Sequence, residues 1–222
     1  MTKPLRKVVA IIAEVIGPKK RVLEIGSRQE KNQKQLANVR GMFGETEYVG
    51  VDMRPGPGVD QVCNAEKLPF KNASFDLVLC LEVLEHAEKP WLVADEVVRV
   101  LKRDGVAIIS SQQNFPIHNH PSDYFRYTPF GMRSLFKKLA SNVVFGIGEG
   151  FDDLVSKNPE HVILVGSKGK KLDIRKLVRQ MTINETKISG HKPYRHRLQT
   201  IIKLAKRIVW EIRFRLSVVV FK

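Results

Sequence analysis

The stretch that decides the fold runs from RVLEIGS at residues 21–27 to EYVGVD at residues 47–52. Both are short apolar runs with a carboxylate at or near the end, and a polar, helix-like segment separates them. This order predicts a strand, a helix and a second strand that is parallel to the first. Because ligands bind outside the carboxyl ends of such strands in open α/β sheets, we expect a binding site where these runs end.

Two residues at these strand ends suit a cofactor that contains adenosine. Gly26 follows the first strand, where a residue without a side chain lets the backbone approach a ligand closely. Asp52 ends the second strand, where a carboxylate can accept hydrogen bonds from both ribose hydroxyls. The glycine-rich run of many such sites is absent, because residues 27–30 read SRQE. On these residues alone, an ordinary strand–helix–strand unit is the alternative.

Composition limits the class of protein. A chain of 222 residues with 43% hydrophobic residues can form one domain with an extension and is not disordered. Cys63 and Cys80 lie in strand-like runs and are expected to be reduced core thiols. Glu14 interrupts the first apolar run, and no run of 18 apolar residues occurs, so we expect neither a signal peptide nor a membrane span. The expected location is the cytoplasm.

The positive charge is concentrated at the C-terminal end. Residues 168–222 hold 16 of the 38 Lys and Arg residues but only 3 of the 23 acidic residues, whereas residues 1–167 are nearly neutral. Two surfaces with different tasks are therefore predicted. We place a first domain at residues 1–167 and a basic helical extension at residues 168–222.

Strands and helices alternate along the first domain. Strands are expected at residues 22–25, 48–51, 59–63, 74–80, 106–110, 142–147 and 161–165, and helices at residues 4–16, 30–43, 90–104 and 128–139. Trp91 is expected on the inward face of the third helix. The last two strands are joined without an intervening helix, which predicts one antiparallel strand. The predicted fold is a seven-stranded, mostly parallel α/β sheet with helices on both faces.

Several motifs after the second strand occur in a family-specific order. They are AEKLPF at 65–70, SFDLV at 74–78, EVLEH at 82–86, then Glu96, RVLK at 99–102 and Asp104-Gly105. With this spacing the chain resembles class I S-adenosylmethionine-dependent methyltransferases, which have a Rossmann-like fold, and more narrowly the type 11 methyltransferase family. The resemblance covers roughly residues 20–167 and excludes the basic extension.

The resemblance implies S-adenosylmethionine as cofactor and assigns residues to its methionine portion. Glu24 and Gly26 would lie against this portion. Leu81 and Glu82, which follow the fourth strand, would line the methionine and the acceptor side.

The resemblance also assigns residues to the adenosine portion. Asp52 would hold the ribose hydroxyls, Met53 would pack on the adenine, and Asn64 and Ala65 would lie at the adenine edge. Asn64 stands where the family usually has an acid. Its amide oxygen can still accept a hydrogen bond from the adenine amino group.

A loop after the fifth strand is the candidate acceptor site. Residues 114–129, NFPIHNHPSDYFRYTP, place two His, an Asp, an Arg and four aromatic residues at the same edge as the cofactor. A hydroxyl acceptor needs a base, for which His is the common choice near neutral pH. We predict His118 or His120 as that base, with Asp123 orienting the imidazole or the acceptor, and Arg126 binding a carboxylate or phosphate of the substrate.

Three alternatives stay open for this loop. Asp123 and Arg126 can pair only to hold the loop, with the neighbouring aromatic residues as core. His118, His120 and Asp123 can bind one metal ion, but their spacing matches no recognised ligand framework, so no metal is predicted. A nitrogen or carbon acceptor would need no strong base.

The extension contains a second amphipathic pattern. From Arg197 to Phe221, apolar residues recur at helical spacing, with basic residues between them and Trp210 among them. Such helices bind anionic membrane surfaces. The alternatives are a helix that docks on the domain or on a second subunit, and an RNA-binding surface. The sequence does not determine the oligomeric state.

The predicted function is methyl transfer from S-adenosylmethionine to a hydroxyl of a sugar, glycan intermediate or other small acceptor. One alternative is a scaffold protein that binds adenosyl compounds without turnover, which the missing glycines favour. A nucleic-acid methyltransferase is the other alternative, and only the charge of the extension favours it.

Overall fold

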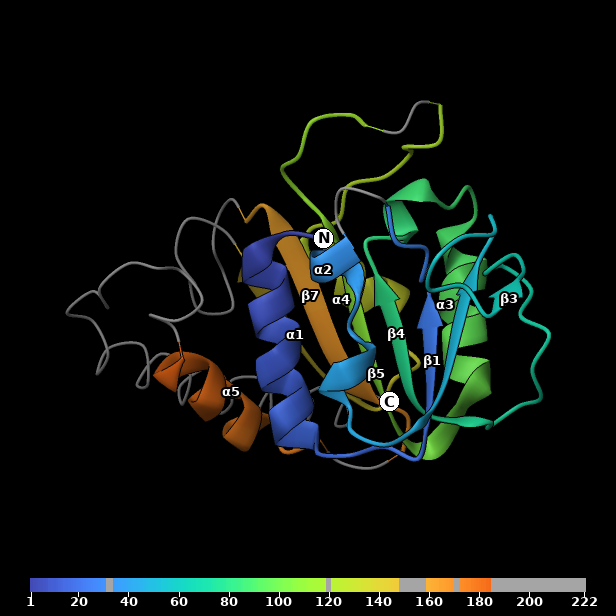
Figure 1. The fold of residues 1–222 in the computed structure, drawn as a ribbon. Helices are drawn as coiled ribbons and strands as arrows, with labels where there is room; N and C mark the ends of the chain where they lie inside the picture. Colours follow the sequence, from blue (N-terminus) through green and yellow to red (C-terminus); the bar gives the residue numbers. More distant parts are fainter. Residues whose placement is uncertain (31–33, 119–120, 148–158, 170–171, 185–222) are drawn as a thin grey trace, which may run out of the picture. The chain divides into compact units, whose positions relative to one another are not determined.

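The computed structural model describes residues 1–30, 34–118, 121–147, 159–169 and 172–184. A seven-stranded sheet lies at the centre, in the order β3-β2-β1-β4-β5-β7-β6 (Figure 1). Its strands are β1 (Arg21–Ile25), β2 (Glu47–Asp52), β3 (Gln61–Val62), β4 (Phe75–Leu81), β5 (Leu101–Gln112), β6 (Ser141–Ile147) and β7 (His161–Ser167).

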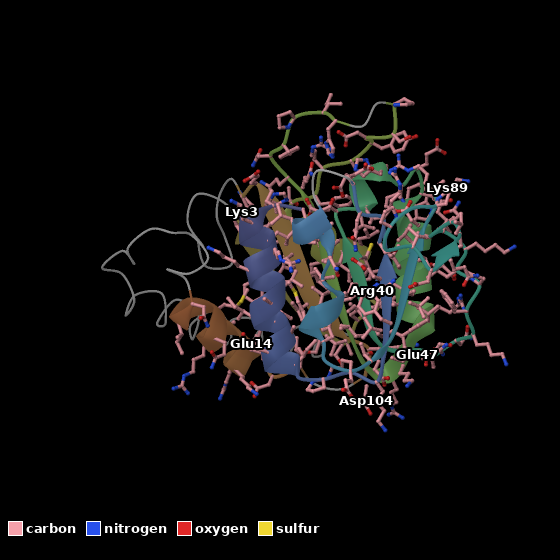
Figure 2. The ribbon with its side chains drawn as sticks, viewed as in Figure 1. Lys3, Glu14, Arg40, Glu47, Lys89 and Asp104 are labelled. Carbon is pink, nitrogen blue, oxygen red and sulfur yellow. The ribbon has the colours of Figure 1, made fainter. Side chains whose placement is uncertain are left out.

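Strand β1 is the middle of a parallel trio. It pairs with β2 on one side and with β4 on the other, so that Ile25 lies between Val51 and Cys80. The residues that follow these three positions, Gly26, Asp52 and Leu81, therefore meet at one edge of the sheet. Glu47 and Asp104 lie at the opposite edge from Lys89 (Figure 2).

Helices cover both faces of the sheet, as predicted. Helix α1 (Lys3–Ile16) and α5 (Ile174–Ile183) share one core cluster with inward residues of β4 such as Leu77 and Leu79. Helix α3 (Pro90–Val100) and α4 (Pro129–Leu135) share the other cluster with Val78 and Cys80. Successive β4 residues thus face opposite cores, which explains the continuous apolar run of this strand.

The predicted antiparallel strand is β7. It runs antiparallel to both β5 and β6, with His161 opposite Gln112 on one side and opposite Ile147 on the other. Because β7 runs in reverse, its first residue lies at the edge where the parallel strands end. This prediction is confirmed, together with the seven-stranded, mostly parallel fold.

The helix predicted at residues 30–43 is much shorter in the structure. Only α2 (Lys34–Ala37) and the 3-10 turn η2 (Arg40–Met42) are helical among the described residues of that range. Arg6 donates to the carbonyl oxygens of Leu36 and Asn38, and the Asn38 side chain accepts a bond from Arg40 N at 3.2 Å. These bonds replace the helical ladder, as Asn side chains can do.

Other predicted boundaries also move. Helix α3 ends at Val100 because Leu101 is extended and pairs with Phe75, and the pairing of β4 with β5 then shifts register before Leu77. Trp91 is 53% exposed, since the buried stripe of α3 begins at Pro90 and continues at Val93. The third predicted strand is reduced to two residues, and α4 ends at Leu135.

The extension is described only at its start. Helix α5 lies beyond the predicted boundary at residue 167, yet its Leu177 and Met181 are fully buried in the core cluster that contains α1. The amphipathic helix predicted at residues 197–221 lies outside the described residues. Within the described ranges, no helix is both long enough and apolar enough to cross a bilayer.

Candidate active site

Gly26 makes the turn that ends β1. Its φ of +77° lies in the left-handed region, which favours glycine. A Cβ at this position would come within 2.2 Å of Val83 Cγ2, so a side chain has no room here. The amide of Gly26 donates to Val51 O at 2.8 Å, which keeps the turn against the end of β2. The predicted need for glycine at this position is therefore explained by both backbone and space.

Asp52 presents its carboxylate at the end of β2. Its two oxygens accept only backbone bonds among the described residues, from Arg54 N at 3.0 Å and from Arg28 N at 3.4 Å. A carboxylate has about four lone-pair sites, so two are left for the hydroxyls of a ribose. The next residue, Met53, is 68% exposed and offers an apolar surface beside the carboxylate.

The turn after β1 contains buried polar atoms that lack a partner. Ser27 Oγ and Arg28 Nε are buried, and neither atom has a hydrogen-bond partner among the described residues. Buried polar atoms in native proteins are usually satisfied. Because these two atoms lie close to Gly50 and Gly56, the fit of an adenosyl cofactor depends instead on the Asp52 carboxylate, which retains lone pairs for a ribose.

Asn64 and Ala65 follow β3 at the same edge. Asn64 is exposed, and its Oδ1 accepts a bond from Glu66 N at 2.8 Å in a local turn. A second lone pair of this oxygen is left for an adenine amino group. Ala65 is half-buried. Their predicted place at the adenine edge stays a prediction.

Glu24 forms a hydrogen bond with a side chain of the neighbouring strand β2. Its side chain is buried, and Oε2 accepts a hydrogen bond from the Tyr48 hydroxyl at 2.9 Å. The Arg40 guanidinium lies over the Tyr48 ring, 4.8 Å from its centroid. Burial raises the pKa of Glu24 to about 7, against the opposing effects of the Tyr48 bond and the Arg40 charge. The predicted contact of Glu24 with the methionine portion stays a prediction.

Glu82 forms a charge pair that sequence analysis missed. Its Oε2 lies 2.8 Å from Nδ1 of His161, which is 1% exposed. Its Oε1 accepts a hydrogen bond from Ser110 Oγ at 2.7 Å. Burial acts against ionisation of both groups, but the contact between them lowers the pKa of Glu82 and raises the pKa of His161. Leu81, the residue before Glu82, is buried at the end of β4.

His161 could have been found only through the topology. It begins the last strand, in an unremarkable apolar run. Only the antiparallel direction of β7 brings that position to the edge where Glu82 lies. The backbone of Glu82 has a φ of +58°, an uncommon value for a non-glycine residue that often accompanies function.

Glu85 is a second buried carboxyl group, three residues further on. It is 0% exposed, and its Oε2 accepts a hydrogen bond from Ser111 Oγ at 2.6 Å. Its Oε1 is buried and has no hydrogen-bond partner among the described residues. Burial and the nearby negative charge of Glu82 raise the pKa of Glu85 to about 8.

The loop at residues 113–127 is held by Asp123 and Arg126. Its described parts, residues 113–118 and 121–127, rise above the edge where the parallel strands end (Figure 1). Arg126 donates from two nitrogens to the two Asp123 oxygens, at 2.6 and 2.8 Å, and to three backbone carbonyls of the loop. The Arg126 contact holds the pKa of Asp123 far below its usual range. Arg126 therefore stabilises the loop and does not need a substrate as its partner. This agrees with the alternative in which Asp123 and Arg126 pair only to hold the loop.

His118 is the predicted base that the structure brings to this edge. Its backbone N donates to Asp123 Oδ2 at 2.8 Å, and its Nδ1 lies 3.2 Å from the same oxygen. The side chain of His118 is 27% exposed, whereas that of Asp123 is 1% exposed. His120, the other predicted base, lies outside the described residues.

Comparison with known proteins supports the class. Residues 23–109 match the family model of the methyltransferase domain. An uncharacterized methyltransferase of Mycobacterium sp. (strain JLS) is 36% identical over 81 residues, which are 32% of this chain and 31% of that protein. An uncharacterized protein of Methanocaldococcus jannaschii is 38% identical over 92 residues, or 41% and 44% of the two chains. The chain thus spans less than half the length of these relatives.

Solved structures share the fold. A Burkholderia thailandensis 1,6-didemethyltoxoflavin-N1-methyltransferase, solved with S-adenosylhomocysteine, has a TM-score of 0.55 at 17% identity over 76% of this chain and 79% of that one. Haemonchus contortus phosphoethanolamine N-methyltransferase 2, in complex with S-adenosyl-L-methionine, has a TM-score of 0.54 at 15% identity over 74% and 52% of the two chains.

These findings confirm the predicted class. Residues 23–109 match the methyltransferase-domain model, and the chain has the Rossmann-like fold of the solved S-adenosylmethionine-dependent methyltransferases named above. The family match covers residues 23–109, which include β1, β2, β4 and the turns that follow them.

The buried Glu24 generates a prediction about stability. Its pKa is about 7 in the folded chain and 4.5 when solvated. Between these values the unfolded chain releases a proton that the folded chain retains, so the free energy of unfolding should fall as pH rises from 4.5 to 7, by about 3 kcal/mol at most. Glu24→Gln, whose amide oxygen can still accept the Tyr48 bond, should show a fall that is smaller by this amount, while the contribution of Glu85 remains in both proteins. Urea denaturation across this range measures it, and parallel curves for both proteins would contradict the assignment.

Proposed function

We propose that the chain transfers a methyl group from S-adenosylmethionine to a hydroxyl of a sugar, glycan intermediate or other small molecule. The observation that carries this proposal is the placement of His118 against the buried Asp123 carboxylate, on a loop above the edge where Asp52 ends β2. A carboxylate that orients an imidazole is the usual arrangement for removing a proton from a hydroxyl.

The cofactor supplies an activated methyl group on a sulfonium ion. On the adenosine side, Asp52 would hold the ribose, with Met53 on the adenine and Asn64 and Ala65 at its edge. On the methionine side, the backbone of the Gly26 turn would lie against the cofactor, while Val83 fills the space that a side chain at Gly26 would need. The end of β4 lies beside this turn, and the residue after it, Glu82, contacts His161.

A second set of residues would meet the methionine and the acceptor. Glu24 and Leu81 complete the wall at the methionine end, and Glu82 lies nearest to the acceptor. The contacts of Glu82 with His161 and Ser110 favour its ionised form against the effect of burial, and they fix the direction of the carboxylate. A fixed carboxylate can accept a bond from an acceptor hydroxyl or from the cofactor ammonium group, which helps to place both reactants.

On the acceptor side, His118 would contribute its Nε2. Nδ1 faces the Asp123 carboxylate and the Pro116 carbonyl oxygen, each at 3.2 Å, so this nitrogen carries the hydrogen. Nε2 is then the nitrogen without a hydrogen, toward which an acceptor hydroxyl can be directed. His120 keeps its predicted role as an alternative base. Asp123 is a positioning residue, because it acts through His118.

Two other functions were considered. The two solved neighbours named above are N-methyltransferases by name, and a nitrogen acceptor would not need the Asp123–His118 arrangement. A protein that binds adenosyl compounds without turnover would also have no use for it. A nucleic-acid acceptor is favoured only by the charge of the extension. The hydroxyl acceptor therefore accounts for more of the described residues.

The cofactor assignment predicts the effect of Asp52→Ala. This substitution removes the partner of the ribose hydroxyls and should weaken S-adenosylmethionine binding by about 1–3 kcal/mol, roughly 5- to 150-fold. Glu47→Ala is the matched control, because Glu47 is a carboxylate at the opposite end of the same strand, with its side chain 61% exposed. Calorimetry measures both affinities. Equal affinity of Asp52→Ala and wild type would contradict the site.

The acceptor assignment predicts the effect of His118→Ala. Turnover should fall by about 10²- to 10⁴-fold, as expected for the loss of a group that assists proton removal. The affinity for S-adenosylmethionine should be unchanged. The assay follows labelled methyl transfer to a panel of sugars and other small hydroxyl compounds. Tyr124→Phe, which removes an exposed hydroxyl from the same loop, is the control. Unchanged turnover in His118→Ala would remove this residue from the mechanism.

We further propose that the basic extension binds the surface of an anionic membrane. The support is the charge of residues 168–222 and the amphipathic pattern of residues 197–221. Truncation should follow Asn184, because Leu177 and Met181 belong to the core of the domain. The full chain should sediment with anionic vesicles and not with neutral ones, while the chain ending at Asn184 should stay in solution. Equal sedimentation of both proteins would contradict this proposal.

A further inference from the structure

We propose that Glu85, His86 and His118 form a binding site for one divalent transition-metal cation, with Zn²⁺ as the best match. One ligand atom from each of the three side chains lies within 4.8 Å of the other two. This set differs from the His118, His120 and Asp123 set considered from sequence. In the structure, the Asp123 carboxylate forms a salt bridge with Arg126 and is not one of the proposed ligands.

The two histidines are oriented as metal ligands usually are. His86 Nδ1 lies 2.5 Å from the carbonyl oxygen of Ser122, and His118 Nδ1 lies 3.2 Å from Asp123 Oδ2. Each Nδ1 therefore carries a hydrogen that is donated to an oxygen. In this tautomer each Nε2 has no hydrogen and offers its lone pair to a metal ion. Histidines that bind metals typically donate their other N–H to a carbonyl or carboxylate in this way. The centroids of the His86 and His118 rings lie 4.9 Å apart.

Glu85 supplies the independent observation that points to a ligand. Its side chain is fully buried, Ser111 occupies Oε2, and Oε1 has no hydrogen-bond partner among the described residues. A buried carboxyl oxygen without a hydrogen-bond partner is costly, and binding of a cation would displace the carboxyl proton. A cation at this position would satisfy it.

The ligand set selects the kind of cation. Two imidazole nitrogens and one carboxylate suit Zn²⁺ and related transition metals, whereas Mg²⁺ and Ca²⁺ prefer oxygen ligands. Bond lengths of about 2.0–2.1 Å place tetrahedral ligands roughly 3.4 Å apart, so the half-buried His86 and His118 must turn inward by a small amount. Three protein ligands leave the fourth position open, as in catalytic zinc sites.

The open position gives the site a role that rests on the proposed function. An acceptor hydroxyl bound there would have a lowered pKa, so its proton passes to water. The oxygen lone pair then forms the new bond to the methyl carbon, and the electron pair of the carbon–sulfur bond stays on sulfur as a thioether. His118 Nε2 would thus act on the hydroxyl through the cation. The loss of turnover expected for His118→Ala is the same.

Calorimetric titration of the full, metal-free chain with Zn²⁺ tests the site. We expect one tight site per chain, at least ten-fold weaker in His86→Ala and in Glu85→Gln, with Mg²⁺ failing to compete. Glu88→Gln, which changes an exposed carboxylate in the same segment, should bind like wild type. Circular dichroism checks that each variant folds. His86→Ala keeps the test valid if Glu85→Gln does not fold, because His86 is only half-buried.

The outcomes separate this inference from the proposed function. No tight binding by wild type, or unchanged binding in His86→Ala, would overturn the metal site whatever the activity. Zinc bound elsewhere, for example by histidines outside the described residues, would leave His86→Ala unchanged and would count against the assignment. Methyl transfer that proceeds equally in metal-free protein would overturn the catalytic role of the cation while leaving the methyltransferase function intact.

Discussion

The parallel pairing of β1 with both β2 and β4 is the constraint on which the rest of the structure depends. Because the three strands end in one row, Gly26, Asp52 and Leu81 come together although they are far apart in sequence. Backbone groups beyond this row cannot be satisfied by the sheet, and a ligand can bind them there. The steric fit of Val83 against Gly26 then requires glycine at the turn.

The same edge concentrates buried charge. Glu82 and His161 lie in charge contact at 2.8 Å, at the ends of β4 and β7, whereas one Glu85 oxygen has no hydrogen-bond partner among the described residues. Burying such groups lowers the stability of the fold, and apolar residues at these positions would not have this cost. Their position under the loop that carries His118 is explained if they place reactants or a cation. We therefore regard this edge as one functional unit, with a cofactor side at Asp52 and an acceptor side at His118.

Much of the fold could be predicted from sequence. Continuous apolar runs mark the buried strands, and the short loop predicted between the last two strands indicates the antiparallel β7. The predicted ends of helices and strands were less accurate where contacts with residues distant in sequence determine them. Arg6 takes the carbonyl oxygens that a helix after Leu36 would use, and pairing with Phe75 turns Leu101 into a strand residue.

Candidate site residues could be proposed from sequence where a residue ends a strand or follows it directly. Asp52, Gly26 and Glu82 are of this kind. His161 was missed because its role depends on the direction of its strand, and Glu85 because its burial depends on the loop above it. Arg126 was assigned to substrate, but only the three-dimensional structure shows that Asp123 and loop carbonyls use its donors.

The most direct test of the central claim is a crystal structure of the full chain with S-adenosylhomocysteine. The account predicts that the ribose hydroxyls lie within hydrogen-bond distance of the Asp52 carboxylate. It also predicts that the sulfur lies beside the Gly26 turn and faces the loop that carries His118. A nucleoside bound away from Asp52, or a sulfur that faces away from that loop, would contradict the account.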